Sequence, residues 1–429
     1  MKRLLTVAIA LLVSQAALAG IKIEHWMTPS GARVLFVESR VLPMLDLRVD
    51  FAAGSMFDPE GKSGLAALTR GTLDLGAGKF DENAIAEQLA DIGASLGGGA
   101  DTDRAGISLR TLSAPDKREP ALAILNSVLH APRFDAAIFA REKARTIASL
   151  KEAMTRPDSI AGKAFWAAMY PNHPYGHQAT PESIAALSRN DLVAFHARYY
   201  NAANANITLV GDLSRADAER IAEAIAAGLP KGKAATLPDA PRLPDWSHVN
   251  IPHPASQSHI YIGLPAIERG NPDYFPLLVG NYTLGGGGFV SRLMKEVRDK
   301  RGYAYSVYSY FAPLKQTGPF QIGLQTKRSQ ARDALKVTRE VLTGFLKDGP
   351  TEEELAAAKA NLTGSFPLRL DSNKKILENV ANIGFYGLPL DYLDQYRAKV
   401  EAVTTDDIRQ AFARRVRPEN LITVTVAAD

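Results

Sequence analysis

Residues 284–310 read LGGGGFVSRLMKEVRDKRGYAYSVYSY, the most distinctive pattern in the chain. The glycines predict a turn, because glycine adopts backbone torsions that other residues avoid. The next residues predict an amphipathic basic helix, and the run of tyrosines after it predicts a strand. This order places Arg298 near the end of the helix and Tyr305 in the strand. The four glycines of the turn are Gly285, Gly286, Gly287 and Gly288.

Composition indicates a globular protein with more than one domain. The chain has 429 residues, of which 46% are hydrophobic and 22% are charged, so we expect at least two hydrophobic cores. It has no cysteine, which excludes disulfides and thiolate metal sites. The formal net charge of +4 falls to +2 without Lys2 and Arg3, so no overall field favours nucleic acid.

Residues 1–19 predict a secretory signal peptide. They begin Met-Lys-Arg, continue with an apolar run from Leu4 to Val13, and end in small residues at Ala19. The apolar run is too short to span a bilayer, no later stretch is long enough, and no cysteine is available for lipidation. We therefore expect an exported protein, periplasmic or secreted, that begins near Gly20 and does not insert into a membrane.

Residues 229–247 predict a linker between two domains, because they are rich in proline and poor in apolar anchors. The linker separates an N-terminal domain, residues 20–228, from a C-terminal domain, residues 248–429. The prolines are Pro230, Pro238, Pro241 and Pro244.

The two halves share a sequence pattern. In the first half, Ile184-x-x-Leu187-x-x-x-Asp191-Leu192 precedes the apolar stretch 206–212. In the second half, Val400-x-x-Val403-x-x-x-Asp407-Ile408 precedes the apolar stretch 420–426. An internal repeat at an offset of roughly 215 residues indicates a duplicated domain.

Short alternating strands are interspersed with long amphipathic helices in both halves. We expect strands at Arg33 to Glu38, Leu45 to Phe51, Gly106 to Leu112, His259 to Gly263 and Phe320 to Gln325, and helices at Asp116 to His130 and Glu352 to Gly364. Because hairpin-like connections are mixed with helices, each domain is predicted to be α+β, a mainly antiparallel sheet with helices packed on one face.

The stretch 284–310 closely resembles the second half of the pitrilysin and mitochondrial-processing-peptidase family of inverted-motif zinc peptidases. The resemblance implies two homologous α+β domains that close like a clam around a peptide chamber. It also implies that Arg298 and Tyr305 are the pair that binds the scissile peptide. The family includes heterodimers in which the metal site and this Arg/Tyr pair lie on different chains.

The zinc motif of that family is absent from this chain. The resemblance implies a helix with His-x-x-Glu-His, in which two imidazoles bind zinc and the glutamate is the general base. The matching positions hold Ala67, Arg70 and Gly71, none of which can hold zinc, and the third-ligand position falls near Ala148 and Ser149. We therefore predict no metal and no cofactor in this chain.

The histidines offer no clear replacement for the missing ligands. His173 and His177 have i, i+4 spacing, but Pro174 and Gly176 lie between them, so a structural turn is favoured over a metal site. The remaining candidates, His248, His253 and His259, are interpreted as solvated or core histidines.

Arg298 and Tyr305 suit the stabilisation of negative charge. Peptide hydrolysis builds charge on the carbonyl oxygen, and each preorganised donor aimed at that oxygen lowers the barrier by on the order of 3 kcal/mol. The plain alternative is a solvated helix face for Arg298 and a strand aromatic for Tyr305. A phosphate-binding loop is disfavoured, because no Lys-Ser or Lys-Thr follows the glycines.

Gly97, Gly98, Gly99 and Ala100 lie in a stretch that resembles the family's substrate-binding edge strand. A peptide adds to a sheet as an extra strand where the edge is unpaired, and small residues let its backbone approach. A flexible hairpin is an equally favoured interpretation of so many glycines.

Loss of the zinc motif and retention of the Arg/Tyr pair together predict the non-metal subunit of a heterodimeric zinc peptidase. In this hypothesis, a homologous partner supplies the zinc, and Arg298 and Tyr305 bind the carbonyl of a peptide substrate. The alternative is a catalytically inactive peptide-binding or assembly protein of the same fold. A homodimeric peptidase with an unrecognised metal site is a third, weaker hypothesis.

Overall fold

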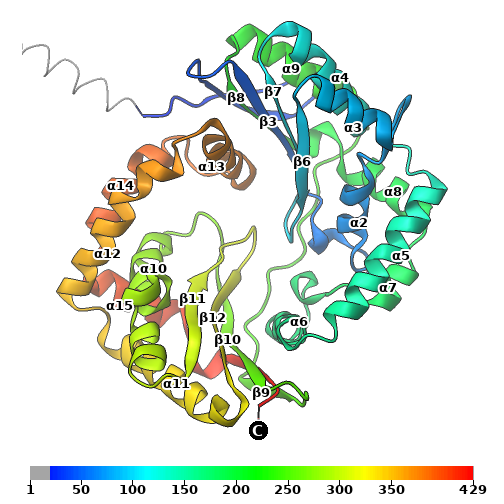
Figure 1. The fold of residues 1–429 in the computed structure, drawn as a ribbon. Helices are drawn as coiled ribbons and strands as arrows, with labels where there is room; N and C mark the ends of the chain where they lie inside the picture. The colour runs from blue at the N-terminus through cyan, green and yellow to red at the C-terminus, as the bar shows by residue number, and fades with distance from the viewer. Residues whose placement is uncertain (1–19, 429) are drawn as a thin grey trace, which may run out of the picture.

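The computed structural model describes residues 20–428, so the predicted signal peptide, residues 1–19, lies outside the described residues. Within them, two halves face one another like the shells of a clam, each built on its own sheet (Figure 1). No helix of this part of the chain is long and apolar enough to cross a membrane. The predicted α+β class and two-domain architecture are confirmed.

The N-terminal half contains a six-stranded sheet in the order β1-β2-β8-β3-β7-β6. Its strands are β1 (Glu24–Met27), β2 (Arg33–Glu38), β3 (Met44–Phe51), β6 (Ser95–Ala100), β7 (Ala105–Leu112) and β8 (Ala205–Gly211), and a small hairpin forms from β4 (Gly76–Ala77) and β5 (Phe80–Asp81). The helices are α2 (Leu65–Thr72), α3 (Glu82–Asp91), α4 (Pro115–His130), α5 (Ala136–Ala153), α6 (Pro157–Met169), α7 (Pro181–Ala185), α8 (Arg189–Tyr199) and α9 (Arg215–Ala227).

The C-terminal half contains a five-stranded sheet in the order β11-β12-β10-β13-β9. Its strands are β9 (Ser247–Ile251), β10 (Gln257–Ile267), β11 (Ala304–Phe311), β12 (Gly318–Lys327) and β13 (Ile422–Val426). Its helices are α10 (Tyr274–Asn281), α11 (Ala331–Asp348), α12 (Glu352–Gly364), α13 (Asn373–Tyr386), α14 (Tyr392–Ala402) and α15 (Thr405–Arg415). The predicted linker is extended chain between α9 and β9.

The internal repeat is visible in the topology. Each sheet is antiparallel except for one parallel pair, β2 with β8 in the first half and β9 with β13 in the second. The helix before β8 begins with a capping box between Ser188 and Asp191, and the helix before β13 begins with one between Thr404 and Asp407. A capping box satisfies backbone N–H groups that the first helical turn leaves free. Asp191 and Asp407 therefore lie at equivalent positions, in the first turn of α8 and of α15.

The two halves exchange a helix. Helix α6 of the N-terminal half packs on β10 and β13 of the C-terminal sheet, and the ring of Phe165 lies 5.5 Å from that of Tyr261. Conversely, α13 of the C-terminal half packs on β2, β3 and β8. Each hydrophobic core therefore includes residues from both halves, such as Val424 in the first and Leu35 in the second. These shared apolar contacts hold the two sheets in a fixed position relative to one another.

Candidate functional site

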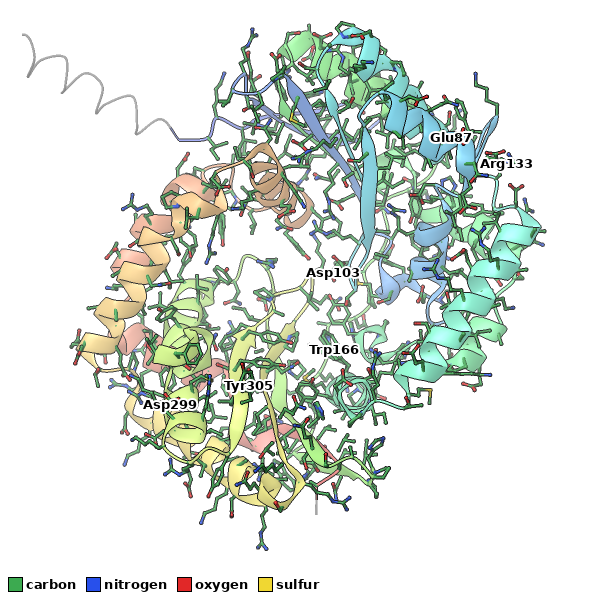
Figure 2. All side chains as sticks on the ribbon, viewed as in Figure 1. Glu87, Asp103, Arg133, Trp166, Asp299 and Tyr305 are labelled. Carbon is green, nitrogen blue, oxygen red and sulfur yellow. The ribbon has the colours of Figure 1, made fainter. Side chains whose placement is uncertain are left out.

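Arg298 and Tyr305 lie side by side, although they come from different elements. Arg298 is in the irregular helical segment Met294–Asp299. Tyr305, labelled in Figure 2, is in β11. The guanidinium carbon of Arg298 lies 5.0 Å from the ring centroid of Tyr305 and 4.7 Å from that of Phe289. Tyr305 is 85% exposed, and Arg298 forms no ion pair within residues 20–428. A cation and a phenol are thus held together, and their donors are not occupied by a carboxylate.

Tyr305 reaches this position through an irregularity in the sheet. Ala304 pairs with Thr326, and Ser306 pairs with Gln325, so Tyr305 is an extra residue without a partner on β12. A β-bulge turns a side chain away from the regular alternation. Consequently Tyr305 and Ser306 are both exposed. Because β11 is an edge strand, no further strand covers Tyr305 on that side.

The segment before Arg298 differs from the predicted amphipathic helix. Tyr282–Gly286 and Met294–Asp299 form π-helical turns, and the 3-10 turn Gly288–Val290 lies between them. Such turns mark strain within a helix and are frequent at functional sites. The predicted segment is helical, but it consists of π-helical and 3-10 turns and not of one regular amphipathic α-helix.

Close packing, more than torsional freedom, explains the four glycines. A Cβ on Gly285 would lie 2.5 Å from the backbone nitrogen of Ser309 in β11. One on Gly286 would lie 2.6 Å from Asn281 Nδ2, and one on Gly287 would lie 2.7 Å from the Tyr282 carbonyl oxygen. Only the fourth, Gly288, has a left-handed φ, +61°. The expectation that all four serve backbone torsions is therefore wrong for three of them.

Arg70, at the position of the family's general base, is a buried structural residue. It is 5% exposed, its Nε donates to the carbonyl of Gly106 at 2.7 Å, and its Nη2 donates to the carbonyl of Gly97 at 2.5 Å. Its Nη1 lies 3.3 Å from Asp74 Oδ1. The side chain therefore ties α2 to strands β6 and β7. This packing role depends on contacts between elements and is not visible in the sequence pattern around Arg70.

The two other motif positions on α2 leave the metal site without ligands. Ala67 and Gly71 lie one turn apart and are both exposed, so this helix face presents no donor atoms. Ala148 and Ser149 lie exposed on α5, and the nearby Glu142 pairs with Arg141 at 2.8 Å. Within residues 20–428 no group of three His, Asp or Glu side chains is arranged to hold a metal ion.

His173 occupies a structural turn at the junction of the two halves. Its Nε2 lies 2.6 Å from Gln316 Oε1, and its Nδ1 accepts a hydrogen bond from the backbone of Tyr175 at 3.1 Å. Burial lowers the pKa of His173, which favours the neutral ring. Both ring nitrogens are occupied, as the interpretation of a turn requires.

Gly97, Gly98, Gly99 and Ala100 belong to β6, the edge strand of the N-terminal sheet. A Cβ on Gly98 would lie 2.2 Å from the carbonyl oxygen of Gly106, and its φ is +107°, so glycine is required there. A cavity of about 360 Å³ lies beside the strand, between β7 and α13. The strand pairs with β7 along Ser95 to Ala100, as one arm of a hairpin. Its role in substrate binding stays a prediction.

Phe289 is a further residue of the site, which the sequence pattern did not indicate. This residue is 67% exposed, and its ring lies 4.7 Å from the Arg298 guanidinium carbon, so a cation–π contact helps to hold the cation. The signal was available, because Phe289 directly follows the glycines, but only the fold brings it next to Arg298.

The fold and the site together define a two-domain protein of the zinc-peptidase type whose described residues do not form a metal site of their own. Two family models match the chain, the insulinase (peptidase family M16) model over residues 33–181 and the peptidase M16 inactive-domain model over residues 186–362. The crystal structure of a peptidase M16 inactive domain from Pseudomonas fluorescens is 41% identical, with a TM-score of 0.91, and the match covers 95% of this chain and 98% of that chain. The chain belongs to peptidase family M16, which confirms the resemblance.

Curated relatives agree with this assignment. The non-peptidase homolog YmxG of Helicobacter pylori is 27% identical over 379 residues, with 87% of each chain covered. The uncharacterized zinc protease YmxG of Bacillus subtilis is 25% identical over 365 residues, with 84% of this chain and 88% of that protein covered. This protein is therefore similar to members described as inactive as well as to members described as zinc proteases.

Proposed function

We propose that this chain is the non-metal subunit of an exported, heterodimeric zinc peptidase. A homologous partner with His-x-x-Glu-His supplies the zinc, which polarises the scissile carbonyl and activates water. This chain supplies Arg298 and Tyr305. The observation that carries the proposal is their geometry, a guanidinium 5.0 Å from an 85% exposed phenol ring and without a carboxylate partner among residues 20–428.

The chemistry of the pair follows from its donors. The oxygen of a peptide carbonyl becomes negative in the transition state, and the guanidinium and the phenol both donate hydrogen bonds. An arginine whose charge was already neutralised by a carboxylate would be a weaker donor. Arg301, in the same segment, is in that state, since its Nη1 lies 2.8 Å from Glu296 Oε2. Arg298 is therefore free to donate to a substrate carbonyl, whereas the guanidinium of Arg301 is already paired with Glu296.

The β6 edge is proposed to hold the substrate backbone as an added strand. The main chain of Gly97 to Ala100 has β7 on one side and no strand on the other. Arg70 already occupies the carbonyl of Gly97, so one acceptor of this edge is not free. Substrate peptides are therefore expected to pair with the remaining groups of β6.

A second candidate is an inactive peptide-binding or assembly protein. The buried contacts of Arg70 support it, because they use the helix at the position of the family's zinc motif for packing against β6 and β7. The description of the Helicobacter pylori relative as a non-peptidase homolog points the same way. In this case the Arg/Tyr pair is retained architecture and contributes nothing to hydrolysis.

An activity assay separates the two candidates. The chain is purified alone and together with the product of a neighbouring gene that encodes His-x-x-Glu-His, and unstructured peptides are supplied as substrate. Activity is expected only in the mixture and is expected to disappear with a chelator. Tyr305→Phe and Arg298→Ala each lower it at least tenfold, consistent with on the order of 3 kcal/mol per donor.

Matched variants in the same segment serve as controls. Arg301→Ala removes a cation that is paired with Glu296, and Tyr303→Phe removes a phenol hydroxyl two residues from Tyr305. Both are expected to retain activity within about twofold. Full activity of an Arg298→Ala/Tyr305→Phe double variant in the mixture would rule out the proposed role and favour the assembly protein.

A further inference from the structure

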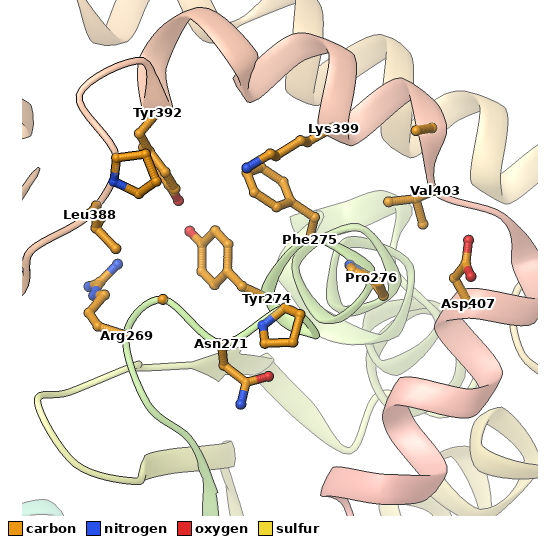
Figure 3. Close-up of a pocket in the computed structure, with 14 residues that line it drawn as sticks. Arg269, Asn271, Tyr274, Phe275, Pro276, Leu388, Tyr392, Lys399, Val403 and Asp407 are labelled. Atoms are coloured by element: carbon orange, nitrogen blue, oxygen red, sulfur yellow. The ribbon is translucent and has the colours of Figure 1, made fainter.

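The C-terminal half contains a pocket of about 400 Å³ that is separate from the Arg298 and Tyr305 pair. It lies between the loop that follows β10, the start of α10, the loop that precedes α14, and the turn from α14 into α15 (Figure 3). Pockets of roughly 300–1,000 Å³ are of the size that encloses small ligands. The volume alone does not identify a ligand. The side chains that line the pocket indicate which chemical groups a ligand would need.

The floor of the pocket is apolar. Phe275 is 9% exposed, and its ring packs against those of Tyr392 and Tyr396 with centroid separations of 5.9 and 5.7 Å. Leu388 and Val403 extend the same surface, together with three prolines. Apolar atoms of a ligand gain about 25 cal/mol for each Å² that they remove from water. An apolar body is therefore favoured over a fully hydrated ion.

Two cationic side chains, Arg269 and Lys399, line the pocket. The guanidinium carbon of Arg269 lies 5.1 Å from the ring of Tyr386, while its Nε is buried and has no hydrogen-bond partner. Lys399 Nζ lies 5.6 Å from the ring centroid of Phe275. Within residues 20–428 neither cation has a carboxylate within ion-pair distance. Hydrogen bonds from a guanidinium or an ammonium group to a carboxylate are charge-assisted, so a ligand carboxylate beside these two side chains is stabilised.

The carboxylate in the lining is already occupied. Asp407 Oδ2 accepts from the backbone of Thr404 at 2.9 Å and from its hydroxyl at 2.7 Å, as part of the capping box of α15. These hydrogen bonds hold the pKa of Asp407 below its usual value, so the carboxylate stays charged. Two cations, Arg269 and Lys399, against this one carboxylate leave the lining with one net positive charge.

Two phenols complete the polar side of the pocket. Figure 3 shows the hydroxyl ends of Tyr274 and Tyr392 turned toward one another, with Lys399 pointing to the same side. Burial raises the pKa of Tyr392, with smaller contributions from the neighbouring Tyr274. A neutral Tyr392 is able to donate a hydrogen bond.

We propose that this pocket binds a small carboxylate with an apolar body, of the kind presented by a hydrophobic amino-acid residue with a free C-terminal carboxylate. Arg269 and Lys399 meet the carboxylate, and Phe275, Leu388 and Val403 enclose the apolar part. This site goes beyond the proposed peptidase role, because it needs neither the partner subunit nor the Arg298 and Tyr305 pair.

Isothermal titration calorimetry on the purified chain tests the assignment. N-acetyl-phenylalanine is compared with its C-terminal amide and with inorganic phosphate. The carboxylate is expected to bind at least tenfold more tightly than either. Equal binding of the amide would overturn the role of the cations, and equal binding of phosphate would overturn the role of the apolar floor.

Charge variants locate the site. Arg269→Gln and Lys399→Gln are each expected to weaken binding of N-acetyl-phenylalanine at least fivefold, whereas Arg269→Lys, which keeps the charge, weakens it less than Arg269→Gln. The control is Lys347→Gln, an exposed cation on α11 that lies outside the pocket. Unchanged affinity in both glutamine variants, with thermal unfolding like that of the unmodified chain, would overturn the proposal.

A hexapeptide that ends in phenylalanine identifies the source of the ligand. If the hexapeptide binds as tightly as N-acetyl-phenylalanine and its amidated form does not, the pocket accepts peptide C-termini. If only the free derivative binds, the ligand is a small acid. Both outcomes support the carboxylate site, and failure of all carboxylates to bind would refute it without affecting the peptidase proposal.

Discussion

The hydroxyl of Tyr386 donates a 2.9 Å hydrogen bond to Oδ2 of Asp103, across 283 residues of sequence. Asp103 lies in the turn between β6 and β7, near the junction of the two halves (Figure 2). Its carboxylate also accepts from the hydroxyl of Tyr175 at 2.6 Å and from the backbone N–H of Lys315 at 2.8 Å. Asp103 is fully buried, and this burial raises its pKa. It is the central polar group of the interface between the halves.

Asp103→Asn is expected to lower the free energy of unfolding by about 2–4 kcal/mol, because an amide nitrogen cannot accept from Tyr386 and Lys315. Tyr386→Phe removes one donor only and is expected to cost about 1–2 kcal/mol. Urea denaturation of both variants measures the difference. If the two substitutions cost the same, Asp103 does not act as a shared acceptor.

The stability contributed by Asp58 is expected to depend on pH. Burial raises the pKa of Asp58 to about 6, although its carboxylate accepts from the backbone N–H groups of Gly64 and Ala66 at 2.7 Å each. Since the folded pKa exceeds the unfolded value of 3.8, the folded state binds the proton more tightly. Stability from this group is greatest below the unfolded pKa and falls as the pH rises to about 6.

This linkage predicts a change of about 2.4 kcal/mol in the unfolding free energy of the native chain relative to Asp58→Asn between pH 4 and pH 7, with the native chain more stable at pH 4. Denaturation of both proteins at the two pH values measures it. A native chain that instead gains relative stability toward pH 7 would show that the two backbone hydrogen bonds outweigh burial.

Arg70→Ala is expected to destabilise the N-terminal half by about 2–4 kcal/mol, because the carbonyls of Gly97 and Gly106 lose their donor. Arg133→Ala is the control, since Arg133 pairs with Asp135 at 2.9 Å in a largely exposed position and should cost less than about 1 kcal/mol. Chemical denaturation compares them. Equal costs would contradict the structural role of Arg70.

Gly285→Ala is expected to cost about 1–3 kcal/mol, because the added methyl would lie 2.5 Å from the backbone nitrogen of Ser309. Gly162→Ala is the matched control, since a Cβ at Gly162 in α6 meets nothing within 4 Å. That substitution should stabilise by roughly 0.5–1 kcal/mol through helix propensity. Thermal unfolding measures both variants. A melting temperature that falls by the same amount in both would contradict the close-packing role of Gly285.

Local periodicity predicted the elements well. The strand Arg33–Glu38 and the helix Glu352–Gly364 have the predicted bounds, because alternation and helical spacing are properties of neighbouring residues. The repeated Asp191 and Asp407 likewise mark real helix starts. The bulge at Tyr305 was not predictable, because it depends on the register of β11 against β12.

The candidate site was predicted in part. The positions of Arg298, Tyr305 and the degenerate zinc motif were read from sequence resemblance, and the structure places Arg298 beside Tyr305. The contact with Phe289, the buried role of Arg70 and the carboxylate pocket were not foreseen. Each depends on contacts between elements, which no local pattern encodes.

The helices and strands, the duplication and the absence of zinc ligands from α2 are readable from residue type and spacing alone. Folding is needed to bring α6 and α13 each onto the sheet of the other half, and to place Asp103 where it joins the halves. The physical reason is that burial and hydrogen bonding across hundreds of residues depend on how complete sheets and helices pack together. Such contacts become visible only when the chain is folded.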